Sequence, residues 1–235
     1  MKGKSDCIEY VDVEGTDLNV NVAAIFYMFF GITHEYAEKA DFKQLSQICV
    51  NKAYRDLCRT VKYGEITQKT KDVIKENTTN LFVENITKLN NHEQVKSFTK
   101  WHRELCKKIT KVHDGGLFSV GQAQKWINMT LKYLRMMGVN FGEFEAQMHI
   151  PIDNYIIEAA KEPQNVNLLD GIDVQGLDIP WNQDCVWSKC NSYEKYLEYQ
   201  NAIKDATQNM QLEWEEKAWE AMAIRHSIED KEGKQ

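Results

Sequence analysis

Two residues in the middle of the chain could do chemistry together. Lys125 lies in the segment GQAQKWINMTLKYL, and Asp153 follows in HIPIDNYI. A lysine amine that has lost its proton is a nucleophile that attacks carbon and forms a Schiff base. A carboxylate beside it can accept the proton or stabilise positive charge that develops on a substrate. The two residues predict covalent catalysis if the fold brings their side chains together.

Lys132 is a second candidate nucleophile. It follows Lys125 by seven residues, so the two amines project together from one flank of a helix. The sequence leaves open which lysine attacks. The alternative is structural, because a lysine on a helix flank is usually a solvated charge and an aspartate before a helix is usually a cap.

A glycine-containing hairpin precedes Lys125. The stretch HDGGLFSVG, from His113 to Gly121, interrupts the helical pattern on either side of it. Backbone N–H groups of such a hairpin, together with the positive end of the following helix, can surround a phosphate. The hairpin predicts a phosphate site, although short helix hairpins with glycine also occur for packing alone.

Basic residues gather around this hairpin although the whole chain has a net charge of −6. Between residues 95 and 135, nine basic residues stand against two acidic ones, which gives +7 locally and leaves −13 for the rest. This segregation is typical of a protein that offers one basic face to a polyanion. A face of solvated lysines is the alternative. The nine residues are Lys96, Lys100, Arg103, Lys107, Lys108, Lys111, Lys125, Lys132 and Arg135.

Helices are expected to position these residues. Helix-forming residues dominate and only three prolines occur, so the fold class is all-α. Apolar spacing predicts a helix from about Gly121 that ends at Gly138, and Asp153 is placed to cap the next helix. Residues 1–235 are expected to form a single domain with two helical lobes and a cleft between them. The other predicted helices are Asn21 to Tyr36, Asp41 to Lys62, Thr67 to Thr78, Asn80 to Asn90, Glu93 to Val112, Tyr193 to Gln208 and Leu212 to Ile228.

The order of hairpin, helix lysine and PID element resembles the helix-hairpin-helix superfamily of DNA glycosylases with a Gly/Pro-rich loop and a catalytic aspartate. The resemblance covers about residues 101–160, and the QK pair in GQAQKW is most similar to the archaeal 8-oxoguanine glycosylases and related bacterial proteins. It implies the helix-hairpin-helix fold, with Lys125 and Asp153 as the catalytic residues. In the common bifunctional members the lysine would stand at Ala123, so Lys132 stays open as the alternative.

The activity that this resemblance implies is that of a DNA glycosylase and AP lyase. The substrate would be double-stranded DNA with a damaged or modified base, an oxidised purine such as 8-oxoguanine above all. The alternatives are a helix-hairpin-helix module that binds DNA without chemistry and a helical protein-interaction module. The residues expected to contact DNA are Ser119, Val120, Gly121, Gln122, Lys132 and His149, the last of which could instead pack in its loop.

No cofactor and no metal are expected. Cys185 and Cys190 lack further ligands at zinc spacing, and the chain has no cluster of four close cysteines for iron and sulfur. The first residues are charged where a signal peptide is apolar, and the apolar run at residues 22–32 is too short to cross a bilayer. We therefore expect a cytoplasmic monomer with free thiols and no membrane contact.

Overall fold

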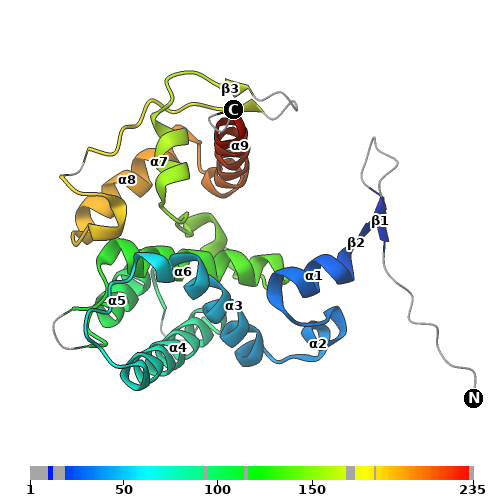
Figure 1. Cartoon of the computed structure of the whole chain (residues 1–235), viewed down its shortest axis with the longest axis vertical. Helices are drawn as coiled ribbons and strands as arrows, with labels where there is room; N and C mark the ends of the chain where they lie inside the picture. Colours follow the sequence, from blue (N-terminus) through cyan, green and yellow to red (C-terminus); the bar gives the residue numbers. More distant parts are fainter. Residues whose placement is uncertain are drawn as a thin grey trace, which may run out of the picture.

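The computed structural model describes residues 10–12, 19–92, 95–113, 116–167, 173–182 and 184–232. Helices dominate this part of the chain, as the sequence predicts, and its strands form two short antiparallel pairs (Figure 1). The α-helices are α1 (Val22–Phe30), α2 (His34–Lys39), α3 (Phe42–Leu57), α4 (Gln68–Asn90), α5 (Phe98–Ile109), α6 (Val120–Met136), α7 (Asn154–Lys161), α8 (Tyr193–Ala206) and α9 (Gln211–Glu232). The shorter elements are the 3-10 helices η1 (Cys58–Thr60), η2 (Gly142–Gln147) and η3 (Trp187–Lys189), and the strands β1 (Tyr10–Asp12), β2 (Asn19–Asn21), β3 (Val166–Asn167) and β4 (Asp173–Val174).

Helix α6 is the central element of the fold. It runs through the middle of the molecule, with α3, α4 and α5 on one side and α7, α8 and α9 on the other (Figure 1). Trp126 on α6 donates its indole N–H to the carbonyl of Val50 on α3 at 2.9 Å, and its ring lies 4.7 Å from that of Phe82 on α4. All residues from 121 to 128 are buried, so the polar side chains among them need partners inside the protein.

The carboxyl-terminal helices pack on one another and hold the segment that joins α6 to α7. Helix α7 packs against α9, and α9 also contacts β4. Trp214 on α9 donates its indole N–H to the carbonyl of Gln175 at 2.9 Å, while Tyr196 and Ile203 on α8 are buried. Residues 148–153 pass between these helices and α6, which is where the candidate catalytic residues meet.

The predicted end of α6 and the predicted start of α7 are confirmed. Gly138 ends α6 with a φ of +84°, a left-handed conformation that glycine adopts without strain. Asp153 caps α7 by accepting a hydrogen bond from the N–H of Ile156 at 3.1 Å. The sequence also predicts the two closing helices correctly, as α8 and α9.

Several of the predicted helices differ from the structure. The predicted helix from Asn21 to Tyr36 is divided into α1 and α2, because Gly31 takes a φ of +73° and Thr33 then caps α2. The predicted break near Thr78 is wrong. The hydroxyl of Thr78 donates to the carbonyl of Ile74 at 2.6 Å, so α4 continues through it. The predicted start at Glu93 lies outside the described residues, and α5 begins at Phe98.

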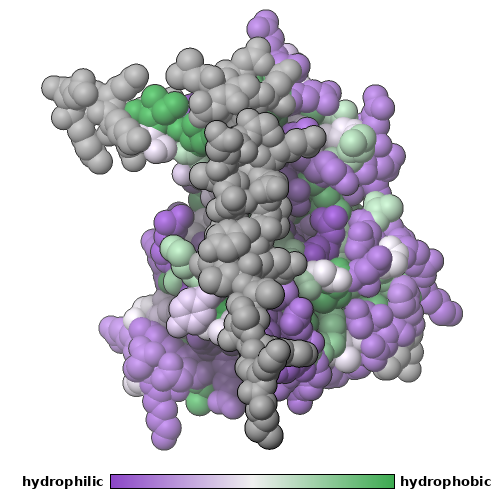
Figure 2. All heavy atoms as spheres, turned by 90° about the vertical axis from the view of Figure 1, so that its right-hand side faces the viewer, coloured by the Kyte–Doolittle hydropathy of each residue, from purple (hydrophilic) through white to green (hydrophobic). Residues whose placement is uncertain are grey.

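The surface in Figure 2 is mostly hydrophilic, and hydrophobic residues reach it only in small patches. Among the described helices, none combines the length and apolar character that a membrane-spanning segment needs.

Candidate active site

A capping box fixes the start of α6. The hydroxyl of Ser119 accepts from the N–H of Gln122 at 3.0 Å, and the Gln122 side chain accepts from the N–H of Ser119 at 3.0 Å. The same two side chains reach other parts of the chain. Ser119 donates its hydroxyl to the carbonyl of Ser188 at 2.8 Å, and Gln122 donates its amide to the carbonyl of Thr60 at 2.7 Å. The helix start is therefore held by segments far away in the sequence.

Gly121 is required by the approach of a second backbone segment. Its N–H donates to the carbonyl of Cys190 at 2.9 Å, and a Cβ atom at this position would lie 1.7 Å from the backbone oxygen of Trp187. Ser119 and Gly121 thus contact η3 and Cys190, and the N–H groups of Gly121 and Gln122 donate to protein oxygens. The contact of this hairpin with phosphate stays a prediction, but the glycine has a packing reason of its own.

The segment before Asp153 is fixed by the amide side chain of Gln124. This side chain donates to the carbonyl of Ile152 at 3.0 Å and accepts from its N–H at 3.3 Å. The double hydrogen bond sets the backbone of Ile152 against α6, one residue before the aspartate. Lys125 follows Gln124 and Asp153 follows Ile152, so the hydrogen bonds between Gln124 and Ile152 bring the two next residues close together.

Two further buried amides hold the same segment at Ile150. Asn128 donates to the carbonyl of Ile150 at 2.9 Å, and the Gln200 side chain donates to that carbonyl at 2.6 Å and accepts from the Ile150 N–H at 3.2 Å. The sequence analysis did not identify these amides as site residues. Gln124 and Asn128 could have been found, because two amide residues four apart lie together on a helix, beside its apolar stripe.

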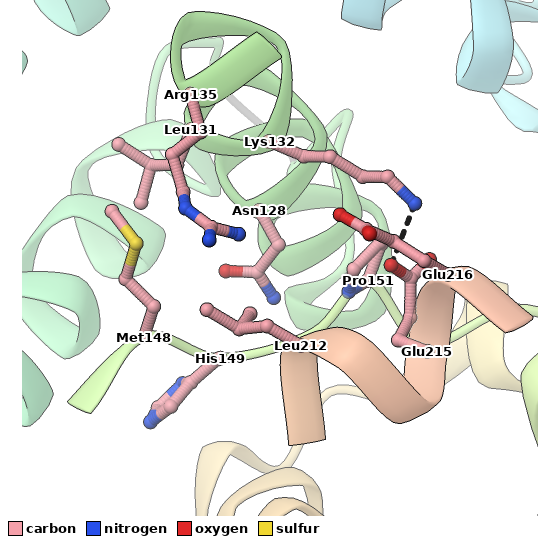
Figure 3. A pocket seen from close by; sticks show the side chains of 10 residues that line it. All are labelled: Asn128, Leu131, Lys132, Arg135, Met148, His149, Pro151, Leu212, Glu215 and Glu216. Carbon is pink, nitrogen blue, oxygen red and sulfur yellow. Dashed lines mark hydrogen bonds and ion pairs between the residues drawn. The ribbon is translucent and has the colours of Figure 1, made fainter. Parts of the chain in front are cut away.

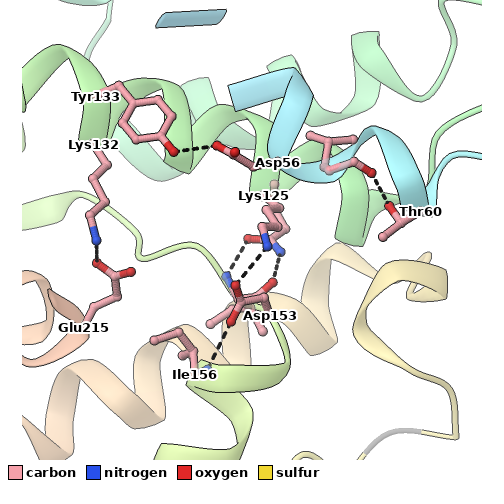
Figure 4. A network of polar contacts seen from close by, with 11 residues as sticks. Asp56, Thr60, Lys125, Lys132, Tyr133, Asp153, Ile156 and Glu215 are labelled. Atoms are coloured by element: carbon pink, nitrogen blue, oxygen red, sulfur yellow. Dashed lines mark hydrogen bonds and ion pairs between the residues drawn. The ribbon is translucent and has the colours of Figure 1, made fainter. Parts of the chain in front are cut away.

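Lys125 and Asp153 form a nearly buried ion pair (Figure 4). The amine Nζ lies 2.9 Å from Oδ2 of Asp153, and the two side chains are 10% and 12% exposed. The other oxygen, Oδ1, caps α7, so one carboxylate serves both the helix and the amine. The centre of the Trp187 ring lies 5.0 Å from Nζ of Lys125. The structure brings together the two residues that the sequence singled out as the catalytic pair.

A second lysine and carboxylate lie next to this pair. Nζ of Lys132 lies 2.6 Å from Oε2 of Glu215, whose side chain is 3% exposed. Burial raises the pKa of Glu215 above its ordinary value; Lys132 opposes this shift, and the charge of Asp153 adds to it. Glu215 was missed in the sequence because nothing in α9 shows which of its many acids faces α6.

The buried charges of the described chain are concentrated at this one place. Of the described Asp, Glu, Lys and Arg residues, those that are buried are Lys125, Asp153 and Glu215. Removing a charge from water is costly even when it is paired, so proteins rarely gather such groups without a reason. A buried cluster of titratable groups, with the raised pKa of the Glu215 carboxyl among them, is typical of functional sites.

The space beside this cluster is small. Figure 3 shows the pocket that Lys132 and Glu215 line together with Asn128, His149 and Pro151. Its cavity volume of about 10 Å³ accommodates a single water molecule. A larger ligand would need neighbouring segments to move, and the segment that carries Trp187 is the one that packs against Lys125.

His149, a predicted DNA contact, lies in the interior. Its Nδ1 is 2.9 Å from the hydroxyl of Tyr196, and its ring centroid is 4.7 Å from that of His102. Burial, with the nearby His102 as a second cause, holds the pKa of His149 well below its ordinary value, so the ring is neutral. This placement agrees with the alternative of packing within the loop.

The basic segment divides into paired and exposed side chains. Arg103 pairs with Glu194, Lys125 with Asp153, Lys132 with Glu215, and Arg135 with Glu145 at 3.9 Å. The other five lie on α5 or beside it and are exposed. They are Lys96, Lys100, Lys107, Lys108 and Lys111. The positive surface that a polyanion could meet is thus a face of α5.

No family model, curated protein or solved structure matches this chain.

Proposed function

We propose that this protein is a DNA glycosylase with AP lyase activity, in which Lys125 is the nucleophile. The observation that carries the proposal is the nearly buried contact of 2.9 Å between Nζ of Lys125 and Oδ2 of Asp153. A nucleophile beside a base that is itself oriented by a third group is the arrangement that covalent catalysis needs. Here the N–H of Ile156 orients the carboxylate.

The chemistry follows from these two groups. Asp153 accepts a proton from the Lys125 amine, and the neutral amine attacks C1′ of a nucleotide that has left the base stack. The bond from C1′ to the base breaks and the base departs with its electron pair and a proton. Ring opening of the sugar gives a Schiff base on Nζ, and loss of the 3′ phosphate by β-elimination cuts the strand. Asp153 passes the proton that it took from Lys125 to the departing base and, as a carboxylate again, stabilises the positive charge of the Schiff base.

The Lys132 and Glu215 pair has a place in the same scheme. It lines the pocket next to the catalytic pair, and burial favours the protonated form of Glu215. A protonated carboxyl group can donate a hydrogen bond or a proton to the departing base. The base would be a damaged or modified one, with an oxidised purine such as 8-oxoguanine as the first choice.

The proposal includes the helix-hairpin-helix fold with two lobes. In its favour, α3, α4 and α5 lie on one side of α6 and α7, α8 and α9 on the other (Figure 1). The segment at residues 148–153 passes between the two groups of helices and carries Asp153. The proposed working form is a monomer on double-stranded DNA.

Borohydride trapping tests this function. A duplex that contains 8-oxoguanine, and a panel of duplexes with other modified bases, is incubated with the protein and sodium borohydride, which reduces the Schiff base to a stable adduct. We expect an adduct that Lys125→Gln abolishes and that Asp153→Asn lowers by about 100-fold. The exposed Lys69→Gln, on α4 rather than on the basic face of α5, is the matched control and should leave the adduct unchanged.

The same assay decides between the two lysines. If Lys132→Gln removes the adduct and Lys125→Gln does not, Lys132 is the nucleophile. An absence of adduct and of released base across the whole panel, with a correctly folded protein, contradicts the enzymatic proposal.

A module that binds DNA without chemistry is the second candidate, and the exposed lysines of α5 favour it. Such a module binds DNA with a strong dependence on salt and keeps its affinity in Lys125→Gln. In that case Lys100→Gln and Lys107→Gln, but not the catalytic-pair variants, weaken binding.

A further inference from the structure

A second cavity adjoins the segment that joins α6 to α7. Met148 and His149 line this cavity as well as the pocket in Figure 3, where the His149 ring points away from Lys132 and Glu215. The other walls come from the start of α5, the end of η2, α8 and the start of α9. The volume of about 130 Å³ accommodates roughly four water molecules, or a small ion with some of its water.

The wall of this cavity is polar and electrically positive. Lys204 on α8 donates one of its three N–H groups to the carbonyl of Ala146 at 3.0 Å and forms no ion pair with a described carboxylate. No Asp or Glu is among the described residues that line the cavity. Thr99 lies in the first turn of α5 and Gln211 begins α9, so the positive ends of two helix dipoles adjoin the space. The cavity therefore favours an anion.

The hydrogen bonds of Tyr196 determine which nitrogen of His149 carries the ring proton. The Tyr196 hydroxyl accepts from Nδ2 of Asn128 at 2.9 Å and lies 2.9 Å from Nδ1 of His149. Among the described contacts of this hydroxyl, Nδ1 is the one that can accept its proton, so we assign the proton of the neutral ring to Nε2. Nε2 is the nitrogen that remains for a ligand, and it is a donor.

Gln211 supplies an acceptor whose partner is missing from the described residues. The residue is 2% exposed, and its side-chain nitrogen donates to the carbonyl of Met148 at 3.1 Å. Its Oε1 has no hydrogen-bond partner among the described residues. Because a buried oxygen without a donor is unfavourable, this atom favours a ligand that carries an O–H group. Hydrogen phosphate has an O–H group in addition to its charged oxygens, whereas sulfate has none.

We propose that this cavity binds inorganic phosphate, with Lys204 and Nε2 of His149 as donors and Oε1 of Gln211 as acceptor. The amine makes a charge-assisted hydrogen bond to a phosphate oxygen, and the imidazole N–H binds a second oxygen. The O–H group of the ion donates to Gln211. A phosphodiester of DNA has no O–H group at neutral pH, so the site selects the free ion over the DNA backbone.

Isothermal titration calorimetry of the whole protein with sodium phosphate tests the site, at neutral pH and in a buffer without other oxyanions. We expect saturable binding of one phosphate per chain. Lys204→Met should weaken the binding about tenfold, because it removes a charge-assisted hydrogen bond. Asn201→Asp, which places a carboxylate in the cavity wall at an exposed residue, should weaken it as well. Lys195→Met, at an exposed position of the same helix, is the matched control and should leave binding unchanged.

Sulfate and dimethyl phosphate test the part of Gln211, because neither has an O–H group at neutral pH. Both should bind about tenfold more weakly than phosphate. An absence of saturable phosphate binding, or binding that Lys204→Met and Asn201→Asp leave unchanged, overturns the site. Sulfate that binds as tightly as phosphate overturns the role of Gln211. None of these titrations contains DNA, so their outcome is separate from that of the glycosylase proposal.

Discussion

Removing the charges of Lys125 and Asp153 singly and together shows whether their ion pair stabilises the fold or costs it stability. Asp153→Asn keeps an oxygen that can cap α7 and removes only the charge. Lys125→Met keeps a long apolar side chain beside Trp187 and removes the amine. Since both side chains are nearly buried, each single change leaves one charge without its partner in a place that water scarcely reaches.

The magnitudes follow from this geometry. Leaving a buried charge unpaired costs about 3 kcal/mol, the value expected for Asp153→Asn. Lys125→Met should cost about 2 kcal/mol, because the amino-terminal end of α7 stabilises the remaining carboxylate by roughly 1 kcal/mol. The double variant has no unpaired charge, so its free energy of unfolding should lie within about 1 kcal/mol of the native value or above it.

Urea unfolding of the four proteins at one pH and salt concentration measures these differences. The exposed pair of Lys88 and Glu84 on α4, 2.6 Å apart, is the matched control, and its cycle should show a coupling below about 1 kcal/mol. A double variant of the buried pair that is at least as unstable as the worse single variant would refute the reasoning. The pair would then be a structural contact, and its burial would no longer argue for chemistry.

Two further predictions concern the surroundings of the pair. Gly121→Ala should lower the free energy of unfolding by about 2 kcal/mol in the same urea assay. The new Cβ atom would lie 1.7 Å from the backbone oxygen of Trp187, so α6 and η3 must separate. An unchanged unfolding midpoint contradicts this contact. Burial lowers the pKa of His102 to about 3, so between pH 6.5 and 3 the unfolded chain binds the additional proton, and the stability present above pH 6.5 is lost as the pH falls. At pH 5 the free energy of unfolding should be about 2 kcal/mol lower than at pH 8 because of His102. His102→Gln should reduce the difference in free energy of unfolding between the two pH values by this amount. If the variant shows the same difference as the native protein, the buried ring is not neutral.

The sequence was sufficient for the central helix, for the glycine that ends it and for the start of α7. The apolar spacing of α6, the glycine at 138 and the aspartate at 153 act locally, so their effect is visible in the residues themselves. The division at Gly31 and the continuity of α4 at Thr78 were not predicted. Glycine and threonine each fit two local conformations, and their neighbours in space decide between them.

The site could be predicted only where its residues belong to a recognisable sequence pattern. Lys125 and Asp153 were identified from the order of hairpin, helix and PID element. Glu215 was not, because α9 contains several acids and only packing on α6 selects the one that meets Lys132. Gly121 was predicted to approach a phosphate, whereas the backbone that approaches it belongs to Trp187, far away in the sequence. The glycine in the sequence indicates that another group comes close to the backbone at residue 121, but it does not show whether that group is a ligand or another part of the chain.

The way in which the Asp153 segment is held bears on the origin of the buried charges. Gln124, Asn128 and Gln200 fix its backbone through neutral amides, which satisfy buried N–H and C=O groups without adding charge. The position of the segment therefore does not depend on Lys125. If an ion pair were needed only to attach this segment to α6, the amides would make it redundant, and an apolar pair would be as stable or more so. This redundancy supports the proposal that the amine and the carboxylate serve in the transfer of a proton and in attack on carbon.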